Sequence, residues 1–243
     1  DTFSSYYEKL KISPKINELF LYKFKYIVIL KTMKLFSILF NYVLLTISKY
    51  NIDESHGLSH AMNSLTYANS IFEKEVIEKP EIKNHEKIIY VSSILHDMCD
   101  KKYMNQKEGI KDISKFISSM GNNSINLSKK EVTVVENIIG TMSYSYVKKN
   151  GFPNHGEYQT AYDIVREADL LCAYDFDRCM MYNLFMYENT DINNAFLEAN
   201  KLFEKRMFKH NEDGLFKTTY ALNNYPLLET GAKQRISHWK RLL

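Results

Sequence analysis

The chain has 243 residues, of which 45% are hydrophobic and 25% charged, so it can form one large domain with a sizeable core. A net charge of +3 leaves no strong nucleic-acid footprint. Only 8 glycines and 4 prolines are present, which argues against a β-sandwich or barrel and favours helices joined by short loops. Three cysteines without a Cys-x-x-Cys pair (Cys99, Cys172, Cys179) predict a reducing, cytoplasmic environment and speak against a cysteine zinc site.

The N-terminal region is amphipathic up to about residue 50. We expect residues 1–50 to form a helical extension packed on a core domain at 51–243. Residues 26–48 are apolar, but their longest uncharged run, 35–48, is too short to span a bilayer. A packed helix is therefore favoured over a helix lying at a membrane surface, and no secretory pattern is apparent.

Hydrophobic periodicity predicts an all-α fold for the rest of the chain. The segment 86–98 is apolar on nearly every side, so we expect it to form a helix at the centre of the domain. Ser128 and Glu131 form a capping box, and residues 148–153 are expected to be a loop. The predicted helical segments are 56–74, 86–98, 107–120, 128–142, 157–187, 191–209 and 226–243. The segment 157–187 is expected to hold one or two helices.

The end of the central helix carries the strongest functional signal. His96 and Asp97 follow the apolar run Ile-Tyr-Val-Ser-Ser-Ile-Leu, where unpaired polar groups are costly. His60 near the start of one helix and Asp169 within another offer two further inward ligands. Two imidazoles and two carboxylates suit one divalent ion (Mn²⁺, Mg²⁺, Fe²⁺, Co²⁺ or Ni²⁺) with open water positions better than a closed zinc site.

This order of ligands resembles the HD-domain phosphohydrolases, whose pattern is H…HD…D, over about residues 50–240. His56-Gly-Leu-Ser-His60 is similar to the His-Asp-x-x-His-x-x-Arg-Val opening of one branch. The eight residues from His96 to Tyr103 are similar to its His-Asp-x-x-Asp-x-Lys-Tyr. Arg166-Glu-Ala-Asp-Leu-Leu with the later Arg178 resembles a third motif. The sequence departs from the branch at four positions, which are Gly57, Asn63, Ser64 and Glu167.

The resemblance implies an HD-domain helical bundle and a metal-dependent phosphohydrolase that acts on a nucleotide or related small phosphate compound. The branch includes bacterial enzymes that release pyrophosphate from nucleoside triphosphates. Only His155 lies between the His-Asp pair and Asp169, which favours a mononuclear site. The alternatives are a phosphomonoesterase or nucleotidase, a non-catalytic module that binds a nucleotide or protein partner, and a membrane-associated partner protein. A homodimer is also considered.

The remaining site residues follow from their chemistry. Asp97 belongs to the catalytic group as a ligand, and Asp100, one turn beyond His96, is expected to accept a proton from the attacking water or support a ligand. Lys102 is expected to bind phosphate and to assist catalysis. The candidate substrate-binding residues are His56, Lys101, Lys102, Lys148 and Arg178.

Several other polar or aromatic residues are expected to be structural. Arg166 and Glu167 form an ion pair in this interpretation. The tyrosines of residues 142–146 are expected to pack rather than to line a pocket, although a pocket role is left open. Trp239 is expected in the core, and three histidines are expected at the surface, namely His85, His210 and His238.

Overall fold

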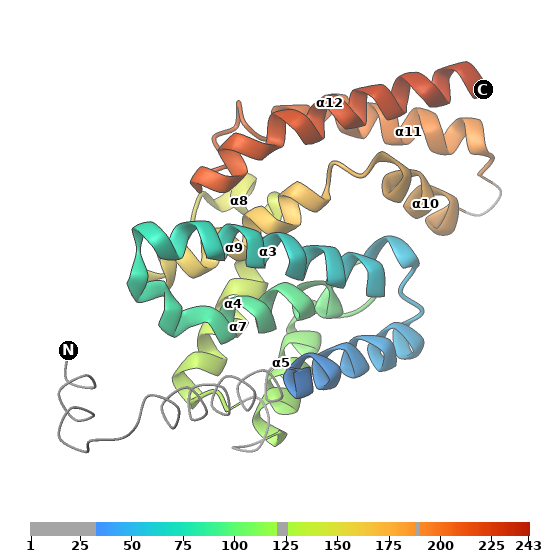
Figure 1. Ribbon diagram of the computed structural model, residues 1–243. Helices are drawn as coiled ribbons and strands as arrows, with labels where there is room; N and C mark the ends of the chain where they lie inside the picture. The colour runs from blue at the N-terminus through green and yellow to red at the C-terminus, as the bar shows by residue number, and fades with distance from the viewer. Residues whose placement is uncertain (1–32, 121–125, 188–189) are drawn as a thin grey trace, which may run out of the picture. The chain divides into compact units, whose positions relative to one another are not determined.

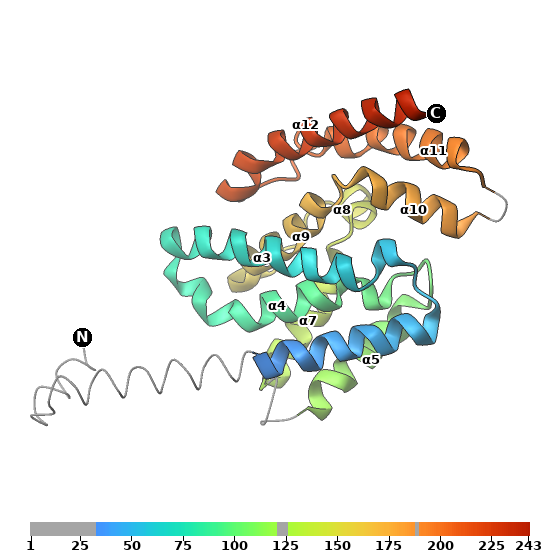
Figure 2. The ribbon, with the colours of Figure 1, turned by 45° about the vertical axis from the view of Figure 1, so that its right-hand side comes forward.

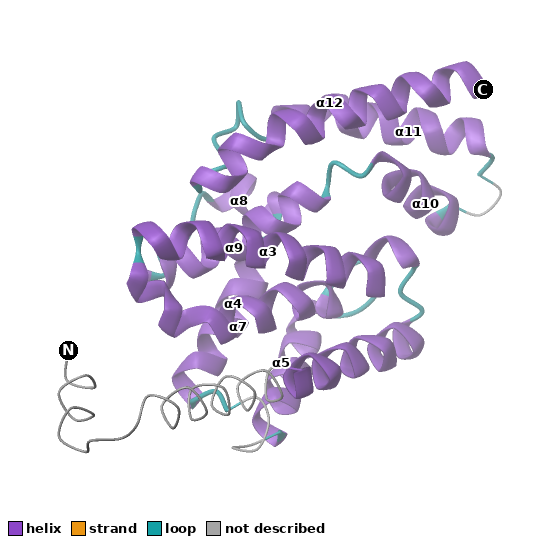
Figure 3. Cartoon of the chain, in the orientation of Figure 1, coloured by secondary structure: helices purple, strands orange, loops and turns teal. Residues whose placement is uncertain are grey.

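The computed structural model describes residues 33–120, 126–187 and 190–243, and within them every regular element is a helix (Figures 1 and 3). The predicted all-α class is confirmed. Contacts divide the chain into Asp1–Ile38 and Leu39–Leu243, so the predicted boundary at residue 50 falls inside the second unit. Most of the predicted N-terminal extension lies outside the described residues.

The described part begins with a helical stretch over residues 33–50. Short 3₁₀ segments occupy Glu54–His56, Pro80–His85, His96–Cys99, Gly156–Tyr158 and Met207–Lys209. The remaining helices are α3 (Leu58–Glu78), α4 (Glu86–Leu95), α5 (Gln106–Ser119), α7 (Lys129–Thr141), α8 (Tyr144–Asn150), α9 (Gln159–Cys172), α10 (Phe176–Met186), α11 (Ile192–Lys205) and α12 (Thr219–Leu242). Among the described helices, none has the length and apolar character required to cross a bilayer.

Helix α4 is the centre of the second unit, as its apolar sequence predicts. All eight of its residues from Ile88 to Leu95 are buried. It packs against α3, α7 and α9, and α3 also packs against α9 (Figure 2). A helix surrounded in this way has no polar face, which explains why its sequence lacks an amphipathic period.

The predicted helix ends agree with the structure where a capping residue next to the helix marks them. The predicted capping box of α7 is confirmed, because Ser128 Oγ accepts from Glu131 N and a Glu131 carboxylate oxygen accepts from Ser128 N at 2.7 Å. The predicted loop at 148–153 is wrong in its first part, since α8 continues to Asn150. A cap at Ser143, which accepts from Tyr146 N at 3.2 Å, starts that helix.

A buried ionic cluster joins α9 to the start of α12. The Arg166 guanidinium lies 3.1 Å from the Glu167 carboxylate, and their exposed fractions are only 1% and 0%, so the predicted ion pair is present but buried. Glu167 also accepts hydrogen bonds from Lys217 N at 2.7 Å, Thr218 N at 3.0 Å and Thr218 Oγ1 at 2.7 Å. This cluster fixes the first turn of α12, seven residues before the predicted start at residue 226.

Two predictions about aromatic side chains are corrected. His210 was expected at the surface but is fully buried among the rings of Tyr144, Tyr174 and Phe216. Its burial lowers its pKa to about 3, so the ring is neutral at physiological pH. Trp239 was expected in the core but is half-buried, and its indole N–H donates to Asp177 at 2.7 Å.

Candidate metal centre

Three helices bring His60, His96 and Asp169 to one point, as the sequence predicts. His60 lies in the first turn of α3, His96 directly follows α4, and Asp169 lies in α9. One ligand atom from each residue lies within 4.8 Å of the others. The two Nε2 atoms are 3.2 Å apart, and Oδ1 of Asp169 lies 3.4 Å from Nε2 of His60. This group can hold a metal ion.

Asp97 lies against the same two imidazoles. Its Oδ2 atom is 3.0 Å from Nε2 of His60, and its Oδ1 atom is 3.4 Å from Nε2 of His96. Oδ2 is buried, and within the described part of the chain it accepts no hydrogen bond of good geometry, although Nε2 of His60 lies beside it. A buried carboxylate oxygen without a well-placed donor is costly, and a cation between the imidazoles and carboxylates would stabilise it.

The backbone after α4 fixes the ring of His96. Its Nδ1 atom lies 2.9 Å from the carbonyl oxygen of Ser93, which can only accept, so Nδ1 carries the proton. The lone pair of the neutral ring is therefore on Nε2, which points at Asp97 and Asp169. This is the arrangement that metal-binding histidines commonly adopt.

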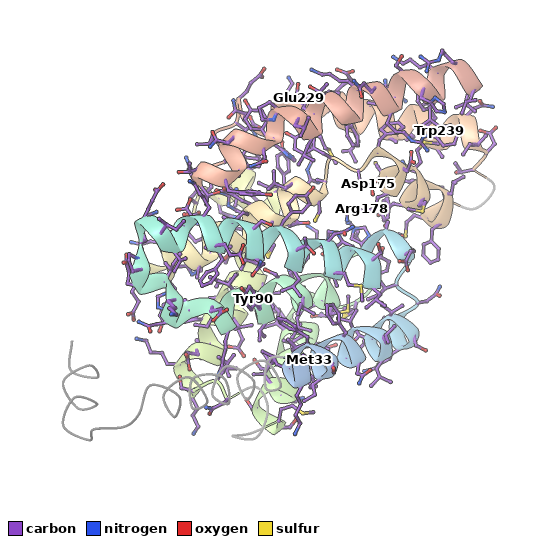
Figure 4. All side chains as sticks on the ribbon, viewed as in Figure 1. Met33, Tyr90, Asp175, Arg178, Glu229 and Trp239 are labelled. Atoms are coloured by element: carbon purple, nitrogen blue, oxygen red, sulfur yellow. The ribbon has the colours of Figure 1, made fainter. Side chains whose placement is uncertain are left out.

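His60 has a different second partner. Arg178 Nη1 lies 2.9 Å from Nδ1 of His60, and a guanidinium can only donate, so Nδ1 accepts. The neutral His60 ring then carries its proton on Nε2, toward the two carboxylates. Binding of a metal ion at Nε2 requires that proton to leave. Arg178 also donates to the Ser55 carbonyl at 2.8 Å, and it lies beside α3 at the start of α10 (Figure 4).

Electrostatics within the cluster favour the charged form of every member. Burial and the Arg178 charge lower the pKa of His60, but hydrogen bonds with Asp169 and Asp97 outweigh them and raise it well above the ordinary value. Burial also opposes ionisation of His96, whose pKa is nevertheless raised by Asp97 and Asp169. The same contacts lower the pKa of both carboxyls against the effect of burial. Both carboxylates are therefore ready to bind a cation.

The cluster lies at a cavity of about 250 Å³. His96, Asp97 and Asp169 are on its wall, and most of the sequence-predicted substrate and catalytic residues join them. These are His56, Asp100, Lys101, Lys102 and Arg178. The tyrosine segment that was expected to pack also contributes residues 142–145 to the lining.

Lys102 and Asp100 form a fixed pair in this cavity. Nζ of Lys102 lies 3.4 Å from Oδ2 of Asp100 and donates to Nε2 of His56 at 2.8 Å. Oδ1 of Asp100 accepts from the backbone N–H of Lys102 at 2.9 Å. His56 is therefore a partner of the predicted phosphate-binding lysine.

Asp53 and Tyr103 contact His56, and no functional role is predicted for Asp53 from the sequence. The Tyr103 hydroxyl donates to Oδ2 of Asp53 and lies 2.9 Å from Nδ1 of His56. Burial raises the pKa of Asp53, but hydrogen bonds with His56, Ser55 and Tyr103 outweigh it, so the net pKa is lowered. The glycine at position 57 belongs to this tight turn, since a Cβ there would approach Oε2 of Glu54 to 2.9 Å.

The other two predicted phosphate-binding lysines occupy different places. Lys148 lies on α8, pairs with Asp213 at 2.8 Å and does not line the cavity. Lys101 is exposed, lines the cavity and reaches Ser145 Oγ at 3.5 Å. Asn63, which stands where the branch that the sequence resembles has arginine, is exposed and outside the cavity lining.

Arg206 is a cavity residue that the sequence did not reveal. It follows the last turn of α11, where neither a motif nor a hydrophobic period marks it. Its guanidinium carbon lies 4.2 Å from the centroid of the Tyr144 ring, and burial lowers its pKa. Tyr182 on α10 also lines the cavity and packs its ring against His56 at 5.3 Å between centroids.

Comparison with known proteins identifies no relative of this chain. No protein-family model matches it, and neither a curated protein nor a solved structure gives a significant match. The chemistry of the site therefore has to follow from its own residues. Imidazole nitrogens and carboxylate oxygens are ligands for several divalent ions, so the donor set does not identify one metal.

Proposed function

We propose that this chain is a metal-dependent phosphohydrolase acting on a nucleotide or a related small phosphate compound. The observation that carries the proposal is the grouping of two buried imidazoles and two half-buried carboxylates at a cavity that is also lined by Lys102 and Arg178. The order of these residues along the chain resembles that of the HD-domain phosphohydrolases, which supports the same chemistry. Three free cysteines agree with action in a reducing compartment.

The ligands would be His60, His96, Asp97 and Asp169. A divalent ion held by them would lower the pKa of a bound water and neutralise charge on a phosphoryl oxygen. The mixed nitrogen and oxygen set favours Mn²⁺, Mg²⁺, Fe²⁺, Co²⁺ or Ni²⁺ over a structural zinc site. One such group is found among the described residues, in agreement with a mononuclear centre.

The protein's own groups bind the substrate and move the proton. Asp100 is on the cavity wall and paired with Lys102, and its carboxylate would accept a proton from the attacking water. Lys102 places a positive charge where a phosphate would enter. His56 orients Lys102 through their 2.8 Å hydrogen bond. Release of pyrophosphate from a nucleoside triphosphate is the specific form of the reaction that the resemblance favours.

A product screen tests the proposal. The purified chain is incubated with nucleoside mono-, di- and triphosphates and with Mn²⁺, Mg²⁺, Co²⁺ or Ni²⁺, and released phosphate and pyrophosphate are measured separately. Pyrophosphate indicates the triphosphate reaction, whereas phosphate alone indicates a phosphomonoesterase or nucleotidase. Release of neither product would point to a non-catalytic binding module and would overturn the proposal.

Matched aspartate variants locate the activity. Asp97→Ala is expected to lose at least about a hundredfold in rate, because a ligand that also lies against both imidazoles is removed. Asp112→Ala, an exposed carboxylate of α5 that pairs only with Lys115, should retain wild-type activity. Full activity in Asp97→Ala would show that the reaction occurs elsewhere.

A further inference from the structure

Arg206 is a half-buried cation of the cavity wall that has no anionic partner in the described part of the chain. Its Nε atom is buried and makes no hydrogen bond, and no carboxylate lies within ion-pair distance of the guanidinium. The ring centroid of Tyr144 lies 4.2 Å from the guanidinium carbon. A guanidinium with a buried, unpaired N–H is costly, so its retention at a cavity points to an anion from outside.

The other cations of the cavity are already engaged. Arg178 donates to the Ser55 carbonyl and to His60, and Lys102 contacts both His56 and Asp100. Arg178 therefore positions a candidate metal ligand, and part of the Lys102 charge is balanced by a carboxylate. Arg206 and the exposed Lys101 have no carboxylate partner in the described part of the chain, and Arg206 differs from Lys101 in having a buried N–H without an acceptor.

The position of Arg206 relates it to the metal centre. Its charge interacts favourably with Asp169 and unfavourably with Arg178, so it lies within electrostatic reach of one candidate ligand. It lines the same cavity as His96 and Asp169. A ligand with one phosphoryl group at the metal centre could therefore present a second anionic group to Arg206. Serine hydroxyls at 143 and 145, 3.4 Å apart, add donors to this wall.

We propose that Arg206 binds a second phosphate of the substrate, so that the cavity selects phosphoanhydrides such as nucleoside di- and triphosphates over phosphomonoesters. This inference rests on the proposed phosphohydrolase function. The planar guanidinium binds a phosphate through two parallel N–H donors, which lysine cannot reproduce. The Tyr144 ring, 4.2 Å from the guanidinium carbon, stabilises the cation at this position.

Binding of simple anions tests the site without turnover. Inorganic pyrophosphate and inorganic phosphate are titrated by calorimetry into wild type, Arg206→Met and Arg206→Lys, each with and without excess Mg²⁺. Arg206→Met should weaken pyrophosphate binding by about 10- to 100-fold, the value of one or two charge-assisted hydrogen bonds, and leave phosphate binding within about threefold. Arg206→Lys should recover part of the loss. Arg241→Gln, an exposed arginine at the end of α12, is the matched control.

The stability of the free variants separates a binding role from a structural one. If Arg206 binds a ligand, replacing its unpaired, half-buried charge with methionine should leave the urea midpoint unchanged or raise it. If Arg206 is structural, Arg206→Met should unfold at lower urea concentration. Unchanged pyrophosphate affinity in Arg206→Met, or an equal loss for phosphate and pyrophosphate, would overturn the inference.

Kinetics distinguish failure of this inference from failure of the proposed function. With wild type, absence of any hydrolysis overturns the phosphohydrolase proposal and, with it, the substrate selection inferred here. With an active wild type, Arg206→Met should lower kcat/KM by about 10- to 100-fold for nucleoside di- or triphosphates and by less than about threefold for p-nitrophenyl phosphate. Equal losses for both substrates would leave the proposed function intact and overturn the role of Arg206.

Discussion

At the residue scale, the centre is defined by two imidazoles that face each other. The Nε2 atoms of His60 and His96 are 3.2 Å apart with carboxylate oxygens on either side. A hydrogen bond between these two nitrogens needs one of them to carry a proton and the other to accept it. In the neutral rings His60 is the donor, because its Nδ1 atom accepts from Arg178 and its proton is therefore on Nε2. A divalent ion bound at this group would therefore have to replace the Nε2 proton of His60.

This competition predicts a pH dependence of metal affinity. The pKa of each histidine is raised above its ordinary value of 6.5, so the rings hold protons to higher pH than free imidazole does. Metal binding must release these protons, and affinity should therefore fall as pH decreases, by about tenfold or more between about pH 8 and pH 6. The carboxyl pKa values are lowered, so Asp97 and Asp169 stay ionised throughout.

Titration calorimetry with Mn²⁺ in several buffers measures both the affinity and the number of protons released. A matched variant, His238→Ala, removes an exposed histidine of α12 and should reproduce the wild-type profile. An affinity that stays constant over this pH range, without proton release, would contradict the ligand roles of His60 and His96.

How far a site residue could be predicted depends on the kind of segment that carries it. His60, His96 and Asp169 lie in or directly after regular helices, where a polar residue on an apolar face is visible in the sequence. Arg206 follows α11 with backbone angles of φ −133° and ψ −62°, outside the helical pattern, and the packing of α11 on α10 brings it to the cavity. No periodic pattern reports such a position, so it became evident only in three dimensions.

At the scale of elements, helix α9 has two polar functions on different faces. Asp169 faces the metal centre, whereas Glu167 accepts from the backbone and side chain at the start of α12. Thr218 is the N-cap of α12 and is itself held by Glu167. The start of α12 at Thr219 therefore depends on a residue about fifty positions away in the sequence. The residues next to the helix do not carry this information, which explains why the predicted start, at residue 226, lies too far along the chain.

We predict that Glu167→Ala lowers the free energy of unfolding by about 3 kcal/mol, because it leaves the buried Arg166 guanidinium without its carboxylate and removes three hydrogen bonds from the start of α12. Burial raises the pKa of Glu167 to about 7, so the comparison belongs at about pH 8, where the carboxylate is ionised. Urea unfolding followed by circular dichroism measures the change.

The matched control is Glu157→Ala. Glu157 pairs with Lys130 at 2.7 Å, but both side chains are exposed, and such pairs contribute little to stability. We expect no measurable change in its urea midpoint. Equal unfolding curves for Glu167→Ala and wild type would mean that the buried cluster does not stabilise the junction between α9 and α12.

At the scale of the whole second unit, the candidate ligands join segments that are distant in the sequence. His60, His96 and Asp169 come from α3, from the end of α4 and from α9, and these three helices pack against one another (Figure 2). Unfolding separates all three ligands. An ion that binds only the assembled group must therefore stabilise the folded state by mass action.

We predict that Mn²⁺ at about 100 times its dissociation constant stabilises the protein by about 2.7 kcal/mol, which for a unit of this size raises Tm by about 5–10 °C. Thermal unfolding followed by circular dichroism, with either Mn²⁺ or EDTA, measures the shift. Asp169→Asn keeps the shape of the side chain but weakens the ligand, so its Tm should respond far less to Mn²⁺. His238→Ala should respond as wild type does. If Asp169→Asn is stabilised as strongly as wild type, the ion binds at another position, because the three helices can transmit binding to stability only through their shared ligands.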